Sequence, residues 1–273
     1  MKDRVFSGVF LVGFILAIVV FNFSFPLALN IAVAVIAAIA VYEMIKAIGL
    51  DRRWFIIVPS MITAVAVQFV NFQDANLLIY SLYVAAIFCA MLRYHKQVSV
   101  SDVSVAMFMI VLIPLALQCI VMVRNLNTEH GIFYALVCIF SAWIPDCGAF
   151  FAGKFFGKHK LCPVISPKKT VEGLIGGVVC STLVLQLAGW VYSTFFYGGT
   201  HDVSWVSMLI IGLAGSLVST LGDLSFSLIK RSYKIKDYGN VIPGHGGILD
   251  RFDSVIFTAP FVYLVTYLLP MVS

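Results

Sequence analysis

The sequence has little charge for its length. Only 11% of its 273 residues are Asp, Glu, Lys or Arg, whereas about a quarter of the residues of a soluble domain are charged. Hydrophobic residues make up 61% of the chain, and the mean hydropathy is +1.01. Apolar runs of about twenty residues, the length that crosses ~30 Å of hydrocarbon, recur along the chain. The composition therefore excludes an ordinary soluble domain and predicts a polytopic membrane protein.

The sequence also lacks paired cysteines, low-complexity segments and a signal-peptide cleavage site. Its six cysteines form no CxxC pair and stand singly in or beside apolar runs, as reduced, buried cysteines do. The first apolar run is followed by no small-residue cleavage site, so we expect it to be retained as a membrane span.

The apolar runs predict an all-α fold of about nine transmembrane helices, because each run is continuously apolar and shows no period-2 alternation. The expected spans are residues 5–22, 26–48, 54–71, 76–93, 103–123, 131–151, 171–195, 205–229 and 254–272. With this assignment, seventeen of the eighteen Lys and Arg residues lie on one side and only Arg124 lies on the other. The positive-inside rule then places the N-terminus in the cytoplasm and the C-terminus outside. The positive-inside distribution of Lys and Arg thus explains the net charge of +5, and we expect no nucleic-acid partner.

Ionisable residues divide the chain into two regions. Residues 1–125 hold five expected spans and form a candidate scaffold and dimerisation region, in which Glu43 is the one carboxylate at depth among the first four spans. A snorkelling or capping role is the expectation for Glu43. Residues 126–273 hold two basic cytoplasmic loops, and Asp146 and Asp223 lie within spans that flank them. A carboxylate facing lipid costs about 2.5–3.5 kcal/mol, so this region is the candidate catalytic region.

The loop after the eighth expected span is the most informative stretch. Asp223, Ser227, Lys230 and Arg231 are spaced to share one helical face, and Asp250 and Asp253 are three residues apart. Asp223, Asp250 and Asp253 are candidate ligands of a hard divalent metal, with neighbouring cations for phosphate groups. The candidate phosphate contacts here are Lys230, Arg231, Lys236 and Arg251. Gly244, Gly246 and Gly247 surround His245 and permit the close backbone approach that a phosphate-binding loop requires.

The loop after the sixth expected span supplies a second candidate anion site. Ser166 and Pro167 are typical of the cap and first residue of a helix, which would place Lys168 and Lys169 on its first turn, beside free backbone N–H groups. The stretch from Gly148 to Lys154 fits GxxxxGK, but it follows a transmembrane helix and lacks the Ser or Thr of a P-loop. No covalent nucleophile is evident, so direct displacement at phosphorus suits these residues best.

The segment from Ser227 to Asp253 resembles the signature of the CDP-diglyceride synthases, also called phosphatidate cytidylyltransferases or CDP-diacylglycerol synthases, of the bacterial type. That signature places K-R, K-D, P-x-H-G-G and D-R-x-D at fixed spacing, and this sequence departs from it at no motif position. The stretch from Asp146 to Gly173 and the triplet Gly222-Asp223-Leu224 also resemble the family. The resemblance covers about residue 141 to the C-terminus in motif and the whole chain in length.

The resemblance implies an enzyme of phospholipid biosynthesis that converts CTP and phosphatidate into CDP-diacylglycerol and pyrophosphate. It implies an integral protein of the bacterial inner membrane, a homodimer, and Mg²⁺ at two metal sites, of which the second is a candidate for a monovalent ion. The implied metal ligands are Asp223, Asp250 and Asp253. The implied catalytic residues are Asp223, Asp250, Lys230, Arg231 and His245. The implied substrate-binding residues are Ser227, Lys236, Arg251, Lys168, Lys169, Gly246, Gly247 and Asp146.

Two other functions fit parts of the pattern. A CTP-dependent kinase of a polyprenol or phytol would need the same metal site, but it would present a hydroxyl to the terminal phosphate of CTP. A transporter could use Asp146 and Asp223 as ion or proton sites, but the sequence has no internal repeat of the kind that transporters often contain.

Overall fold

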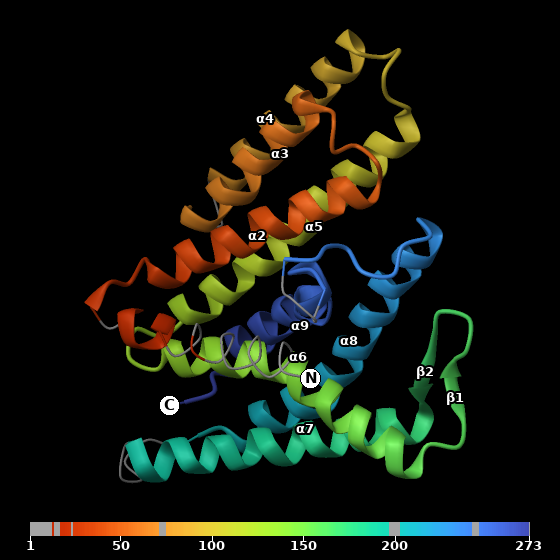
Figure 1. Cartoon of the computed structure of the whole chain (residues 1–273). Coiled ribbons are helices and arrows are strands. Elements are labelled where there is room, and N and C mark those ends of the chain that lie inside the picture. Colours follow the sequence, from red (N-terminus) through yellow and green to blue (C-terminus); the bar gives the residue numbers. More distant parts are fainter. Residues whose placement is uncertain are drawn as a thin grey trace. The chain divides into compact units, whose positions relative to one another are not determined.

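The computed structural model describes residues 13, 17–22, 24–70, 75–196, 203–241 and 246–272. This described part of the chain is mainly helical and contains one short two-stranded sheet (Figure 1). The helices in chain order are α2 (Ala28–Ala47), α3 (Trp54–Ala66), α4 (Ala75–Arg93), α5 (Val100–Asn125), α6 (Gly131–Phe156), α7 (Val171–Val191), α8 (Trp205–Ser232) and α9 (Leu249–Leu268). A 3₁₀ turn, η1 (Val67–Phe69), extends α3, and a π-helical turn, η2 (Tyr192–Phe196), extends α7.

Within the described residues, six helices are long and apolar enough to cross a membrane, as expected of a multi-pass membrane protein. They are Ala28–Ala47, Ala75–Arg93, Val100–Asn125, Gly131–Phe156, Val171–Phe195 and Trp205–Ser232, and Trp54–Phe69 is a shorter apolar helix. Most of the first expected span, residues 5–22, lies outside the described residues. The count of nine spans and the orientation of the termini stay predictions.

The strands β1 (Lys160–Cys162) and β2 (Ser166–Thr170) depart from the expected all-α fold. They pair antiparallel, with Lys160 opposite Thr170 and Cys162 opposite Ser166. Ser166 and Pro167 therefore do not open a helix, and that prediction was wrong. The cap of α7 is Thr170, whose Oγ1 accepts a hydrogen bond from the Gly173 N–H at 3.1 Å. The sequence was compatible with both arrangements, because Pro also fits a strand at a sheet edge.

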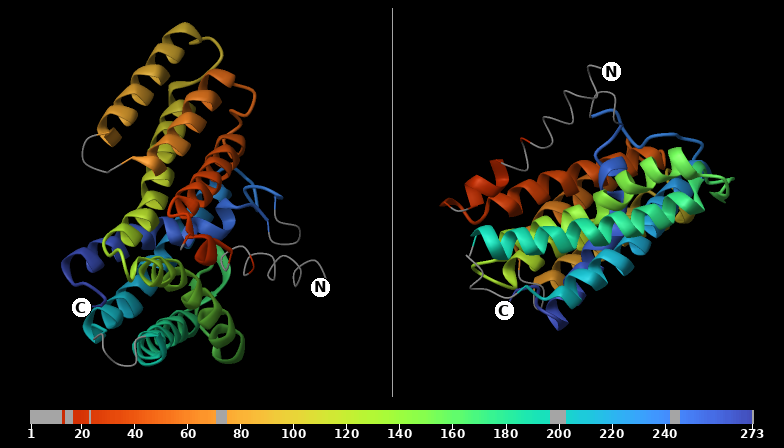
Figure 2. Two further views of the ribbon diagram at one scale, coloured as in Figure 1. Left: turned by 90° about the vertical axis from the view of Figure 1, so that its left-hand side faces the viewer. Right: turned by 90° about the horizontal axis from the view of Figure 1, so that it is seen from below.

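The chain forms two compact units, Met1–Val121 with Ser232–Phe252, and Met122–Arg231 with Asp253–Ser273. In the first unit α3 packs against both α2 and α4 (Figure 2). Buried amides connect these helices with α5, as interhelical hydrogen bonds do in membrane proteins. Asn30 donates to the Gln68 carbonyl, Gln68 to the Pro114 carbonyl, and Asn76 to the Gln118 side chain. The polar contacts in this part of the unit are therefore mostly uncharged.

In the second unit, α6 and α7 pack side by side along much of their lengths (Figures 1 and 2). Glycines permit the close approach that a GxxxG spacing predicts. A Cβ on Gly177 would lie 2.7 Å from the Pro145 carbonyl oxygen, and one on Gly148 would lie 2.6 Å from the Cβ of Cys180. On α8, the Ser219 hydroxyl donates to the Ala142 carbonyl of α6 at 3.0 Å. These contacts fix the helices that carry Asp146 and Asp223.

Candidate active site

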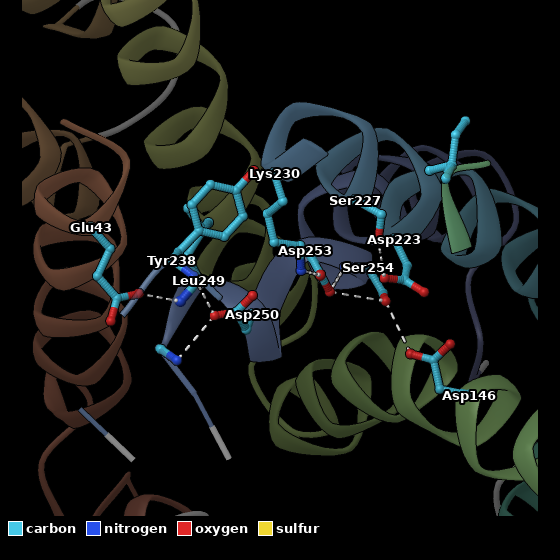
Figure 3. A network of polar contacts seen from close by, with 12 residues as sticks. Glu43, Asp146, Asp223, Ser227, Lys230, Tyr238, Leu249, Asp250, Asp253 and Ser254 are labelled. Atoms are coloured by element: carbon cyan, nitrogen blue, oxygen red, sulfur yellow. Dashed lines mark hydrogen bonds and ion pairs between the residues drawn. The ribbon is translucent and has the colours of Figure 1, made fainter. Parts of the chain in front are cut away.

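The second unit contains a cluster of carboxylates and lysines, on α6, α8, α9 and β2 (Figure 3). Asp223 and Ser227 lie one turn apart on α8, and the Ser227 hydroxyl donates to Asp223 Oδ1 at 3.4 Å. Lys230 follows on the same helix, and its Nζ lies 3.7 Å from Asp253 Oδ2 of α9. Both members of this ion pair are buried. A buried charge is stable only when paired, so α8 and α9 stabilise each other's charged residues here.

Gly222 lets α9 approach α8 at this cluster. A Cβ on Gly222 would lie 2.9 Å from the Asp253 carbonyl oxygen and 3.0 Å from the Cβ of Phe257. Any larger residue at position 222 would therefore push α9 away and lengthen the contact between Lys230 and Asp253.

Asp146 belongs to the same cluster. The Ser254 hydroxyl donates to Asp146 Oδ2 at 3.1 Å, and the Ser254 N–H donates to Asp253 Oδ1 at 2.8 Å. The charges of Asp223 and Asp146 also act on Asp253. Asp146 thus lies beside the other carboxylates, a proximity that its position in the sequence could not establish.

The hairpin formed by β1 and β2 brings Lys169 into this cluster. Successive side chains of a strand point to opposite faces, so Lys168 is exposed while Lys169 is partly covered and forms an ion pair with Asp223. Had α7 begun at Pro167, the two lysines would have stood on its first turn as predicted. Arg231 also reaches the hairpin, since its Nε donates to the Ile165 carbonyl at 3.4 Å.

A second polar network lies in the first unit, where the chain returns from α8 to α9 (Figure 3). One oxygen of Asp250 accepts hydrogen bonds from the Tyr238 N–H at 2.8 Å and from the Gly247 N–H at 3.0 Å. Gly246 has a φ of 87°, a left-handed conformation that glycine adopts without cost. Asp250 therefore stabilises the turn that precedes α9, and its role as a metal ligand stays a prediction.

Glu43 has the capping role that was one of the two expected from the sequence, but the helix it caps is not its own. Its carboxylate accepts hydrogen bonds from the Ile248 and Leu249 N–H groups at 3.1 Å and 2.8 Å. It therefore caps α9 from α2. The available signal was its isolation as a carboxylate in an apolar helix, but the distant helix that it caps could not be identified from spacing.

The other predicted residues of this segment differ in exposure. Lys236 and Arg251 are exposed, whereas Gly247 is buried. The predicted His245, with Gly244, lies outside the described residues.

The acidic residues fit Mg²⁺ in chemistry, although no three Asp, Glu, His or Cys side chains of the described residues are grouped closely enough to hold a metal ion. Mg²⁺ is usually bound through one or two carboxylates together with substrate phosphates and water. Asp223 and Asp253 are neighbouring carboxylates in the second unit, so the two carboxylate ligands of such a Mg²⁺ site are present.

A family model described as the cytidylyltransferase family matches residues 2–269. The chain belongs to the cytidylyltransferase family. A phosphatidate cytidylyltransferase of Bacillus subtilis is 33% identical over 288 residues, which cover 97% of this chain and 97% of the relative. One of Staphylococcus saprophyticus is 32% identical over 238 residues, covering 84% of this chain and 86% of the relative. One of Staphylococcus aureus is 45% identical over 137 residues, half of each chain. The resemblance found in the motifs is thus confirmed along almost the whole chain.

Proposed function

We propose that this chain is a membrane nucleotidyltransferase that converts CTP and phosphatidate into CDP-diacylglycerol and pyrophosphate. The observation that carries the proposal is the 33% identity to a phosphatidate cytidylyltransferase over 97% of both chains. The clustered carboxylates and lysines on α6, α8, α9 and β2 support it, because transfer to and from phosphate groups depends mainly on positioning and charge stabilisation.

The reaction is a displacement at phosphorus. An oxygen of the phosphatidate phosphate forms a bond to the α-phosphorus of CTP, and the bond from that phosphorus to the oxygen bridging the α- and β-phosphates breaks. That oxygen keeps the electron pair and leaves with pyrophosphate. Negative charge grows on the departing group, so cationic side chains aimed at it lower the barrier.

Asp223 and Asp253 are the proposed ligands of Mg²⁺, with Asp250 as the further predicted ligand. The metal, when bound, would neutralise charge on the triphosphate. A second metal site, a candidate for a monovalent ion, belongs to the same proposal.

The cationic side chains have proposed substrate roles. Lys169 and Lys230 pair with Asp223 and Asp253, so these lysines could exchange between carboxylate and phosphate oxygens. The further proposed phosphate contacts are Lys168, Arg231, Lys236, Arg251 and the backbone of Gly246 and Gly247. Ser227 hydrogen-bonds Asp223, and Asp146 is held by Ser254, so both orient the acidic cluster. His245 is retained as a proposed catalytic residue.

We further propose nine membrane spans, with the N-terminus in the cytoplasm and the C-terminus outside, in the inner membrane of a bacterium. The distribution of Lys and Arg supports this orientation, with only Arg124 on the outer side. Both basic loops then face the compartment that contains CTP, while phosphatidate arrives from the bilayer. A homodimer, with residues 1–125 as its scaffold, completes the proposal.

The proposal is tested by product analysis of purified protein in detergent with phosphatidate, labelled CTP and Mg²⁺. We expect labelled CDP-diacylglycerol and pyrophosphate from the wild type, and no CDP-lipid from Asp223→Asn. Asp51→Asn is the matched control, because Asp51 is an exposed carboxylate in the turn between α2 and α3. Its activity should equal that of the wild type.

The same assay with a polyprenol in place of phosphatidate separates the kinase alternative. Release of CDP from CTP, with the terminal phosphate transferred to the polyprenol, would identify a lipid kinase instead. A folded wild type that produces no CDP-lipid from phosphatidate would refute the proposed reaction.

A further inference from the structure

Glu43 is a buried carboxylate of α2, with 3% of its surface exposed. Its two oxygens accept hydrogen bonds from two successive backbone N–H groups, those of Ile248 and Leu249. Groups at the start of a helix have no acceptor within the helix. Glu43 therefore satisfies donors at the start of α9 from a position 206 residues away in the chain.

The space occupied by Glu43 explains a glycine of the turn before α9. A Cβ on Gly247 would lie 2.5 Å from both carboxylate oxygens of Glu43, and its three nearest atoms all belong to Glu43. Gly247 does not have a positive φ, so its backbone conformation would accept alanine. The requirement for glycine here is therefore steric, and Glu43 imposes it.

A second glycine has the same neighbour. The three atoms nearest to a Cβ on Gly239 are also atoms of the Glu43 side chain. Asp250 joins two stretches of backbone, because it accepts hydrogen bonds from the Tyr238 and Gly247 N–H groups. Gly239 lies on the first stretch, next to Tyr238, and Gly247 lies on the second. The carboxylates of Glu43 and Asp250 thus hold the same turn from different directions.

We infer that Glu43 is a positioning residue for the reaction: it fixes the backbone of residues 246–250, and with it the Asp250 carboxylate. This inference rests on the proposed function for its link to catalysis. Glu43 acts through backbone N–H groups and has no assigned contact with substrate. Glu43 lies in residues 1–125, the expected scaffold region, so this region would also help to position the signature segment Ser227–Asp253.

A double-mutant cycle tests the inference. A displacement of about 1 Å in an active site can lower a rate roughly a hundredfold, so we expect Glu43→Ala and Gly247→Ala each to lower kcat/KM for CTP by up to roughly that factor. Thermal unfolding measures the coupling: the double variant should be no less stable than Glu43→Ala, because the added methyl group then meets no carboxylate. Losses of stability that add in the double variant would contradict the steric coupling.

A structural measurement separates positioning from general destabilisation. Hydrogen exchange of peptides covering residues 246–252 should be faster in Glu43→Gln than in the wild type, while exchange in α3 and α4 stays unchanged. Asn30→Ala is the matched control, because Asn30 is also a buried polar residue of α2 but donates to Gln68. It should leave exchange in residues 246–252 and kcat/KM unchanged.

The outcomes distinguish this inference from the proposed function. An active wild type whose Glu43→Gln variant retains full kcat/KM and normal exchange would overturn the positioning role alone. A wild type that forms no CDP-lipid would overturn the proposed function, and exchange in residues 246–252 would then decide whether Glu43 holds the turn.

Discussion

Replacing Gly177 by alanine tests how closely α6 and α7 must pack. The new Cβ would lie 2.7 Å from the Pro145 carbonyl oxygen and 3.2 Å from the Ala149 Cβ. The oxygen belongs to the backbone and cannot rotate away, so the helices must separate by roughly half an ångström or more to regain ordinary contact. Overpacking of this kind costs about 1–3 kcal/mol, against a gain in helix propensity of at most ~1 kcal/mol. The net effect is a loss of stability.

The measurement is thermal unfolding of the purified variants in detergent, followed by tryptophan fluorescence. A change of 1 kcal/mol shifts Tm by about 2–4 °C in a chain of 150–250 residues, and we expect Gly177→Ala to lower Tm by roughly 2–6 °C. Gly215→Ala is the matched control, because the nearest atom to its Cβ would lie 3.7 Å away on the Phe261 ring. Its Tm should be unchanged or higher.

The two variants make the same chemical change in transmembrane helices and differ in the space available. If Gly177→Ala raised Tm as much as Gly215→Ala, the close approach of α6 and α7 would not limit packing, and the steric reasoning would be refuted. A loss in both variants would instead implicate the alanine side chain itself.

Two further predictions concern single contacts, and a third concerns the proposed membrane orientation. Thr170→Val should lower the free energy of unfolding by about 1 kcal/mol because it removes the cap of α7, whereas Thr170→Ser should retain stability. Thermal unfolding measures both variants, and equal stability of Thr170→Val and Thr170→Ser would exclude the cap. Ser254→Ala removes the donor to Asp146 and should cost about 0.5–1.5 kcal/mol, measured in the same way, with Ser254→Thr as the variant that keeps a hydroxyl. Val164→Cys, at a position 90% exposed between the strands, should react with a membrane-impermeant maleimide in inside-out vesicles but not in intact cells, in a background without native cysteines. Labelling from outside the cell would reverse the proposed orientation.

The sequence determined most of the helices, because the length of an apolar run and its flanking polar residues are local properties. The described helices α2 to α8 begin and end close to the expected spans, and α9 begins at Leu249, five residues before the expected residue 254. The spacing on α8 correctly predicted the neighbouring positions of Asp223 and Ser227. The motif pattern also identified the family, which the relatives confirm.

Only the tertiary structure decided which distant groups meet. Ser166 and Pro167 suit a helix start or an edge strand, and pairing with Lys160–Cys162 selected the strand. Lys169 forms an ion pair with Asp223, and Asp146 accepts a hydrogen bond from Ser254. These contacts depend on how helices pack, and the periodicity of a single segment does not predict that packing.

Glu43 illustrates this division. A capping role for it could be anticipated, since an unpaired carboxylate is costly in hydrocarbon. Its acceptance of hydrogen bonds from Ile248 and Leu249 could not, because α2 and the turn before α9 are joined by packing and are distant in sequence. The sequence therefore determined the membrane helices and the chemical groups available, and the packing of those helices decided which groups act together.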